Sequence, residues 1–272
     1  MNRDPGAGAP GFTLSLASRA LAYTCFASFV ILSKVIVHLG HVHELTRYPV
    51  KSMAGLPTNS AFLGWHGLEG DRRFAFRRLN DKSEFPWLSA SRLPELLLYQ
   101  PNGLAEPTHV RTPEGLNLPI GSPELQDEVA GKFGSPLELM KLKHGIFDDA
   151  TVSVINLATI AAIGREAGHD LDTRRFRANI VIASNSTEPF LEDSWVGGRL
   201  VFGSDEAAPM INITMPDPRC VMINLDPDTA KQDPSVMKAA VRLNENNAGA
   251  YATVARTGQI TVGQPVSLLV ET

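Results

Sequence analysis

Cysteine is scarce in this chain, because only two of its 272 residues, Cys25 and Cys220, are cysteines. Two are too few for a four-cysteine zinc site or for an iron–sulfur cluster held by one chain. A disulfide between them is disfavoured, since Cys25 lies in an apolar N-terminal stretch that looks like a targeting segment. So few cysteines fit a reducing compartment. Cys220 is left as the thiol to explain.

Neither sign of charge is in large excess, since the net charge is -4 and the isoelectric point is about 6.0. This balance excludes a global basic footprint for nucleic acid. The phosphate-binding pattern G-x-x-x-x-G-K-[ST] is absent. Gly6, Gly8 and Gly11 match the dinucleotide pattern G-x-G-x-x-G by letter only, because no strand precedes them. Nucleotide binding by these routes is unsupported.

Acidic residues are absent from residues 5–43. Arg19 precedes an apolar run over residues 20–32, which continues after Ser33 and Lys34 into residues 35–37. Residues 20–37 approach the length that spans a bilayer. Three interpretations stay open: a membrane anchor through residues 19–39, a cleaved mitochondrial targeting peptide, or a mis-called extension of a cytoplasmic protein. In each, residues 1–40 are expected to lie outside the folded core.

Three histidines, His38, His41 and His43, end this segment, and the last two share a face of a predicted strand. A metal site here is disfavoured, because no cluster of cysteines or carboxylates accompanies them.

Glycine and proline are plentiful, at 22 and 19 residues, and strong helical periodicity is scarce, which predicts short strands and turns. Predicted strands cover residues 42–48, 74–77, 96–99, 136–142, 176–183, 199–202, 211–214, 251–255, 259–262 and 266–270. A hairpin is predicted over 108–119, and short helices within 123–132, 152–164 and 231–244. The fold class is therefore β-rich α+β, with one large or two small domains.

Cys220 follows the run Pro216-Asp-Pro218 and Arg219. Two prolines exclude a helix interior and predict a rigid turn. Residues 221–225 then predict a strand, closed by a turn over residues 226–229. A neighbouring arginine favours thiolate over thiol. The residues alone leave three interpretations open: an inert buried cysteine, a nucleophile, or a ligand for a soft metal whose other ligands come from a cofactor.

Basic residues recur in turns and at strand ends beside Gly, Ser and Asn, although the chain is not basic. They are Lys51 with Ser52, Arg72 with Arg73, Arg174 with Arg175, Arg177 and Arg219. Such positions let backbone N–H groups and cations approach an anion together. The scattered pattern favours a small anionic cofactor over a polyanion, which needs a continuous basic stripe.

Seven motifs then occur in a fixed order between residues 42 and 270. They are Arg47-Tyr-Pro-Val-Lys-Ser52, Gly67-Leu-Glu-Gly-Asp-Arg-Arg-Phe74, Arg175-Phe-Arg-Ala-Asn-Ile180, Glu192-Asp-Ser-Trp-Val-Gly197, Pro218-Arg-Cys-Val-Met222, Asp226-Pro-Asp-Thr229 and Thr261-Val-Gly-Gln-Pro-Val266. In this order the chain resembles the MOSC-domain family with its N-terminal β-barrel-like partner domain. It looks most like the branch of the mitochondrial amidoxime-reducing component. The resemblance implies a leading segment over 1–40, an N-terminal β domain over 41–145 and a MOSC β-barrel over 146–270.

The resemblance also implies a molybdenum–pterin cofactor. Cys220 would be the metal ligand and, with Asp193, the catalytic pair. The cofactor would be bound by Lys51, Ser52, Arg73, Arg177, Asn179, Arg219 and Cys220. Asp193 as a turn cap and Trp195 as core packing are equally open. In the family's Thr-Ala-Arg-Gln segment this chain has Ser89-Ala-Ser-Arg-Leu-Pro94, so contacts by Ser91 and Arg92 are not carried over.

The implied activity is reduction of N-hydroxylated compounds by a molybdenum oxidoreductase. A separate protein of the heme or the flavin/iron–sulfur type would donate electrons, since the chain lacks cysteines for a ferredoxin-like tail. The alternative is a carrier of cofactor or sulfur, as in sulfurases, whose fused pyridoxal-phosphate domain finds no counterpart here. A third possibility is a β-rich domain with an inert Cys220.

Overall fold

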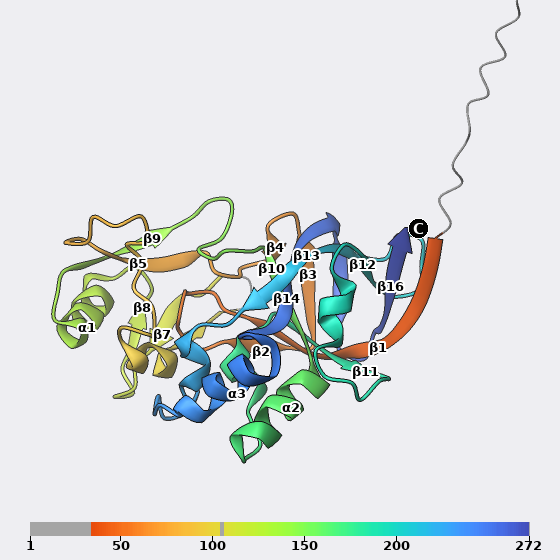
Figure 1. Ribbon diagram of the computed structural model, residues 1–272. Helices are drawn as coiled ribbons and strands as arrows, with labels where there is room; N and C mark the ends of the chain where they lie inside the picture. Colours follow the sequence, from red (N-terminus) through yellow and green to blue (C-terminus); the bar gives the residue numbers. More distant parts are fainter. Residues whose placement is uncertain (1–33, 104–105, 272) are drawn as a thin grey trace, which may run out of the picture. The chain divides into compact units, whose positions relative to one another are not determined.

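Seven strands close into a barrel in the order β11–β10–β14–β13–β12–β16–β1, because β1 pairs with both β16 and β11. The computed structural model in Figure 1 describes residues 34–103 and 106–271. The barrel strands are β1 (Lys34–Arg47), β10 (Val152–Asn156), β11 (Ile180–Ser184), β12 (Arg199–Phe202), β13 (Met210–Pro218), β14 (Asn247–Arg256) and β16 (Pro265–Glu271). A short strand, β2 (Leu56–Thr58), pairs with the end of β1.

The barrel interior is filled by apolar side chains that alternate along the strands. Val42 and Leu45 of β1, Val152 and Val154 of β10, and Ile211 of β13 are fully buried or nearly so in this cluster. Trp195 closes the cluster from a 3₁₀ helix, Leu191–Trp195. Because the barrel is closed, none of its seven strands is an edge strand.

The pair β10–β11 is parallel, whereas the other neighbouring barrel strands are antiparallel. A parallel pair needs a crossover, and α2 (Leu157–Ala167) is part of it. Asn156 caps the start of α2, and Gly168 ends it in the left-handed conformation. Figure 1 shows α2 beside α3 (Pro234–Asn244). The two helices bury Ile160, Ile163 and Val236 with residues of the barrel's outer surface.

A second hydrophobic core is formed mainly by the part of the chain between β1 and β10. It joins the ladder of β5 (Phe74–Arg78) with β9 (Leu137–Lys141), the meander β6 (Gln100–Asn102), β7 (His109–Arg111) and β8 (Asn117–Pro119), and α1 (Pro123–Phe133). Ser122 caps α1 and Gly134 ends it. A further ladder pairs β3 (Ser60–Gly64) with β4 (Gly67–Leu68) and β15 (Gly258–Thr261). The domain boundary at residue 145 stays a prediction.

The β-rich α+β class is confirmed, as are the hairpin over 108–119 and the three short helices. The strand predicted at 96–99 is wrong: a 3₁₀ helix, Pro94–Leu98, stands there instead. Pro94 supplies the fixed backbone angle of a first helical residue, and the tight turn buries both Leu96 and Leu97 on the second core.

Residues 34–40 also correct a prediction, because they do not lie outside the core. They form the first half of β1 and pair with β16, and Leu39 is buried there. The rest of the apolar leading segment, with Cys25, lies outside the described residues. Among the helices of the described ranges, none combines the length and the apolar composition that crossing a membrane requires.

Candidate functional site

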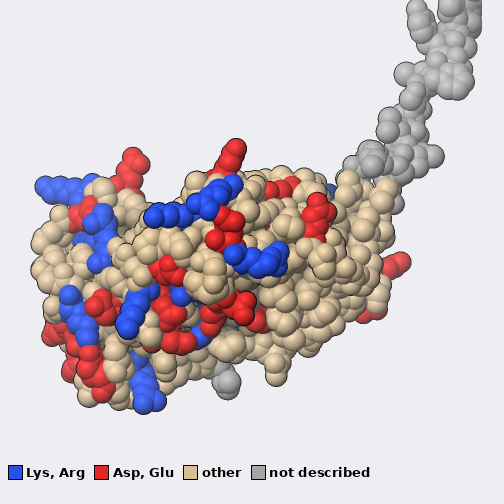
Figure 2. All heavy atoms as spheres, turned by 60° about the horizontal axis from the view of Figure 1, so that its bottom comes forward, with Lys and Arg blue, Asp and Glu red and all other residues tan. Residues whose placement is uncertain are grey.

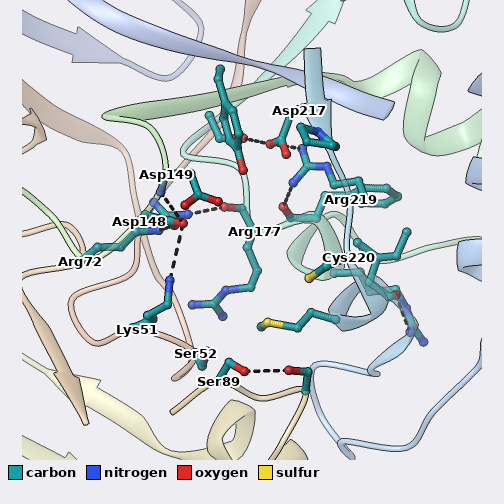
Figure 3. A pocket seen from close by; sticks show the side chains of 18 of the residues that line it. Lys51, Ser52, Arg72, Ser89, Asp148, Asp149, Arg177, Asp217, Arg219 and Cys220 are labelled. Carbon is teal, nitrogen blue, oxygen red and sulfur yellow. Dashed lines mark hydrogen bonds and ion pairs between the residues drawn. The ribbon is translucent and has the colours of Figure 1, made fainter. Parts of the chain in front are cut away.

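A pocket of about 360 Å³ opens where the second core meets the end of β13. Its lining comes from seven separate segments of the sequence, and Figure 3 shows 18 of the lining side chains. The lining residues are Lys51, Ser52, Arg72, Phe85, Ser89, Ser91, Asp148, Asp149, Ser153, Arg175, Phe176, Arg177, Asp217, Pro218, Arg219, Cys220, Met222, Ile223 and Tyr251. Five of the predicted site residues, Lys51, Ser52, Arg177, Arg219 and Cys220, therefore meet in one place.

Cys220 is a free, exposed cysteine between β13 and a 3₁₀ helix, Val221–Asn224. The rigid turn predicted at Pro216–Pro218 is wrong, because these residues are the bulged end of β13 and pair with β14. Bulges accommodate prolines, which cannot donate to a regular ladder. Figure 3 shows the Cys220 sulfur directed into the pocket.

The strand predicted over residues 221–225 is wrong as well. The amide of Ile223 donates to the Cys220 carbonyl at 3.2 Å, which closes a tight helical turn. Ile223 packs beside α2 and α3, whereas Leu225 packs in the second core. A turn delivers these two side chains to different cores, which an extended strand over one core would not do. The turn predicted over 226–229 is confirmed, with Asp226 accepting from the Thr229 amide at 2.9 Å.

Arg219 is committed to the fold rather than to the open pocket. Its Nε donates to the Ala248 carbonyl at 2.5 Å and its Nη1 to the Phe176 carbonyl at 2.6 Å. Its Nη2 lies 2.8 Å from an Asp217 carboxylate oxygen. Gly249 lies against it with a φ of 92°, and a Cβ built there would be 2.7 Å from Nη2. Arg219 thus fixes the backbone that presents the neighbouring thiol.

Asp217 is buried at the end of β13. Ser153 Oγ donates to its carboxylate at 2.7 Å, and Arg219 forms an ion pair with it. Burial raises the pKa of Asp217, while Arg219 and the hydroxyls of Ser153 and Tyr251 act in the opposite direction. We call Ser153, Asp217, Arg219 and Tyr251 the network side of the pocket.

Lys51, Ser52 and Arg177 form the cation side of the pocket. Figure 3 shows Lys51 and Ser52 opposite Asp217 and Arg219, with the Arg177 guanidinium directed toward Lys51. Lys51 Nζ donates to the Phe147 carbonyl at 2.8 Å, and Arg177 Nη1 to the Met53 carbonyl at 2.8 Å.

Burial makes the charged forms of Lys51 and Arg177 less favourable than they are in water. Burial lowers the pKa of Lys51, and it lowers the pKa of Arg177 to about 10. Arg177 lies over the Tyr48 ring with 4.2 Å between guanidinium carbon and ring centroid. It has a φ of 51° and Ser52 one of 66°, so both sit in the left-handed region that side chains other than glycine rarely adopt. Strained backbone of this kind clusters at functional sites.

Arg72 and Asp148 lie next to the cation side. Arg72 forms ion pairs with Asp71 and Asp148, and its Nη2 donates to the Arg177 carbonyl at 2.9 Å. Asp148 also lies 3.6 Å from Lys51 Nζ. Although burial opposes its ionisation, Arg72 and Lys51 hold the pKa of Asp148 below its usual value. Asp149 lines the pocket next to it and is exposed.

The other predicted site residues stand outside the pocket lining. Arg73 donates to the Leu142 carbonyl at 3.0 Å. Asn179 is buried and accepts from Arg72 at 3.1 Å, so it holds a lining residue in place. Asp193 accepts from Asn244 at 2.7 Å, and Trp195 is wholly buried in the barrel. Ser91 lines the pocket, whereas Arg92 is exposed and is not among its lining residues. The roles given to Arg73, Asn179 and Asp193 stay predictions.

Several lining residues were not predicted as site residues, chiefly Asp148, Ser153, Asp217 and Tyr251. Arg72 was named with Arg73 among the basic residues, but only Arg73 was assigned to the cofactor, because the doublet gave no sign of which side chain faces inward. Asp217 was noted only as part of a turn between prolines. Tyr251 had no signal beyond its place in a predicted strand.

A buried glutamate, Glu192, contacts the segment that packs against Arg219. Glu192 is fully buried and accepts from the Gly249 amide at 3.1 Å and from Thr159 Oγ1 at 2.9 Å. Burial raises its pKa to about 7. Because Gly249 abuts Arg219, Glu192 supports the segment that holds the arginine.

Charge on the surface is mixed. On the face of the described chain in Figure 2, basic and acidic side chains are interspersed and form no continuous basic stripe. In the ranges that the structure describes, no three His, Cys, Asp or Glu side chains group closely enough to hold a metal ion by themselves. A metal at Cys220 would therefore need ligands from a cofactor.

Two curated relatives are similar to this chain. "Mitochondrial amidoxime reducing component 2" of Bos taurus is 27% identical over 137 residues, which is 46% of this chain and 38% of that protein. "Molybdenum cofactor sulfurase" of Drosophila grimshawi is 24% identical over 275 residues, which is 83% of this chain and 34% of that protein. The matches thus span little more than a third of either relative.

Among solved structures, the YUAD protein from Bacillus subtilis matches 89% of this chain and 100% of its own, with 13% identity and a TM-score of 0.49. The family model of the MOSC domain matches residues 141–267. That stretch contains five of the seven barrel strands in full, the start of β16, and Cys220. On this match, the chain contains a MOSC domain.

Proposed function

We propose that this protein binds a molybdenum–pterin cofactor in the pocket and reduces N-hydroxylated compounds with electrons from a separate donor protein. The observation that carries the proposal is the exposed Cys220 thiol in a pocket of a MOSC domain, opposite two cations. The name of one relative points to the molybdenum cofactor, and the name of the other points to amidoxime reduction.

The residues present fit such a group. A thiolate suits a soft metal that lacks other protein ligands. Arg177 and Lys51 present cationic donors to the pocket, and arginine suits phosphate in particular. Cys220 would hold the metal, and Lys51, Ser52 and Arg177 would hold the anionic part. The chemistry supplied by this cofactor is two-electron reduction with removal of the substrate oxygen.

The protein's own residues would position the cofactor and shape its surroundings. Arg219 and Asp217 hold the backbone that precedes Cys220. Phe85, Met222 and Ile223 give the pocket apolar walls that restrict water. Lys51 and Arg177 balance negative charge on the side away from Asp217.

The first experiment measures molybdenum by mass spectrometry and pterin by fluorescence in the full chain, purified from a host that makes the cofactor. The variants are Cys220→Ser and, as the matched control, Cys25→Ser. We expect near-stoichiometric molybdenum in the wild type and in Cys25→Ser, and loss in Cys220→Ser with an unchanged circular dichroism spectrum. Reduction of hydroxylamine and amidoxime probes with an added electron donor should follow the metal. Well-folded wild-type protein with neither molybdenum nor pterin would refute the proposal.

The match to a cofactor sulfurase over 83% of the chain favours a second candidate, a carrier of cofactor or sulfur. A carrier would show persulfide on Cys220 in the intact-mass spectrum, and no reductase turnover with any donor. Turnover by the molybdenum-loaded wild type would exclude it as the main role.

A further inference from the structure

A carboxylate, Asp148, stands beside the cation side, and the proposed function gives it no role. Its neighbour Phe147 is buried and fixes its position. The Phe147 amide donates to the Arg72 carbonyl at 2.8 Å, and the Phe147 ring packs edge-on against Trp87 with 4.6 Å between centroids. A fixed acid next to cations repels an anionic ligand that approaches them. Asp148 therefore restricts which anions the pocket accepts.

Two cations keep Asp148 charged. One carboxylate oxygen forms an ion pair with Arg72 Nε, and the other lies 3.6 Å from Lys51 Nζ, the pair that Figure 3 marks with a dashed line. Arg72 and Lys51 also hold the pKa of Asp148 below its usual value, so the side chain is ionised at neutral pH. An ionised carboxylate only accepts hydrogen bonds. The pocket wall thus presents an acceptor directly beside the ammonium group of Lys51.

Asp148 has acceptor capacity left for a ligand. A carboxylate offers about four lone-pair directions. Its oxygens contact Arg72, Lys51 and the Asp149 amide, which donates at 3.0 Å. Its side chain is 26% exposed, on the wall of the pocket. A ligand bound to Lys51 can therefore donate a hydrogen bond of its own to Asp148.

The donors that would bind an anion lie next to this acceptor. Lys51 has three N–H donors, of which one binds the Phe147 carbonyl at 2.8 Å and another faces Asp148. Arg177 has five, and the bond from Nη1 to the Met53 carbonyl uses one of them. An anion that bridges Lys51 and Arg177 would lie between these donors and a carboxylate. Its oxygens near Asp148 are repelled unless one of them carries a proton.

We propose that Asp148 is a specificity-determining residue, which makes the pocket select oxyanions that keep an acidic O–H group over oxyanions that are fully ionised. The retained proton is donated to the Asp148 carboxylate, while Lys51 and Arg177 bind the ionised oxygens. The inference rests on the proposed function for the statement that the cation side holds the anionic part of a ligand. It adds the protonation state in which that part binds.

Hydrogen phosphate and sulfate provide the test, because at pH 7.5 they are similar in size and charge but only hydrogen phosphate has a proton to donate. Their affinities are measured by calorimetry on the full chain, purified from a host that does not make the pterin cofactor. A hydrogen bond to a charged group changes affinity about ten- to a hundredfold, so the wild type should prefer hydrogen phosphate by about tenfold or more. In Asp148→Asn, an amide N–H is able to donate to sulfate, and the preference should fall to about threefold or less.

The matched control is Asp149→Asn. Asp149 is exposed and lines the same pocket, so the variant removes the same charge one residue away from the ion pairs of Asp148. It should tighten the binding of both anions and leave the preference at its wild-type value. Thermal melting checks that each variant is folded.

Methyl phosphate tests the inference on the wild type alone. The second pKa of a phosphate monoester is about 6, so at pH 7.5 methyl phosphate has mostly lost its last acidic proton. It should therefore bind as weakly as sulfate. Binding as tight as that of hydrogen phosphate would contradict the role of Asp148, whatever the variants do.

Equal affinities of the wild type for hydrogen phosphate and sulfate, or no binding of either, would overturn the inference. So would an unchanged preference in folded Asp148→Asn. Molybdenum and pterin are measured on wild-type protein from a host that makes the cofactor, which keeps the two proposals apart. Selectivity that depends on Asp148, in a protein that never holds molybdenum, contradicts only the proposed function. Bound molybdenum and pterin without this selectivity contradict only the role of Asp148.

Discussion

Each side of the pocket contains an arginine, but the two arginines differ in what their hydrogen-bond donors do. On the network side, two nitrogens of Arg219 donate to the Ala248 and Phe176 carbonyls, and the third, Nη2, is buried in an ion pair with Asp217 that lacks hydrogen-bond geometry. On the cation side, Lys51 and Arg177 each donate to a single carbonyl and keep further N–H groups toward the pocket. A cation near a cavity is therefore a ligand-binding group only if its donors are not already used. The sequence analysis treated Arg219 and Arg177 alike, and the structure separates them.

The largest effect is expected from Arg219→Met. This change leaves the carboxylate of Asp217, which is 2% exposed, without its counter-charge. Removing one partner of a buried pair costs about 3–5 kcal/mol in the free energy of unfolding. Urea denaturation monitored by circular dichroism measures it. Adding Asp217→Asn should recover at least half of the loss. A single variant as stable as the wild type would show that the two sides do not differ in this way.

Glu192→Gln extends the comparison behind the network side, and its effect should depend on pH. The folded pKa of Glu192 is about 7, above the ordinary value of 4.5. The protonated form is favoured in the fold, so its contribution to stability is fully present below pH 4.5 and is lost as pH rises through 7. From pH 5 to pH 8, the wild type should lose about 2 to 3 kcal/mol more than Glu192→Gln. Parallel pH profiles of the unfolding free energy would contradict this account.

The smallest effect on stability is expected from Lys51→Met. Burial already disfavours the charge of Lys51, and Asp148 keeps its ion pair with Arg72. The free energy of unfolding should change by less than about 1 kcal/mol. Retained pterin, measured after gel filtration, should nevertheless fall clearly below the wild-type value. A variant that loses stability as Arg219→Met does, with normal pterin, would reverse the assignment of the two sides.

The sequence predicted the elements best where one local signal decides them. Ser122 and Gly134 mark the two ends of α1, and residues 113–115 mark the hairpin turn. It failed where two cores compete for one segment. Residues 221–225 look like a strand because they are apolar, yet Ile223 and Leu225 belong to different cores.

The sequence could predict which residues belong to the site, but not which hydrogen-bond and ion-pair partners their side chains have. Cys220, Lys51 and Arg177 could be chosen by residue type and resemblance, and they line one pocket. The commitment of Arg219 to Asp217, and of Asn179 to Arg72, depends on side-chain directions fixed only in three dimensions. Tyr251 could not be chosen, because its place in the pocket lining depends on how β14 pairs with β13.

The pairing of β1 with β16 places strands from the two ends of the described chain side by side. Contacts between such distant segments form slowly, because the entropy of closing a long loop is lost before the contacts can stabilise the fold. During synthesis, β1 has to wait for the last strand to leave the ribosome before the barrel can close. The turn that carries Lys51 follows β1 directly, and Tyr251 is made only shortly before β16. We therefore expect the pocket to mature only after β16 has been made, so that any ligand binds a chain that already holds every barrel strand.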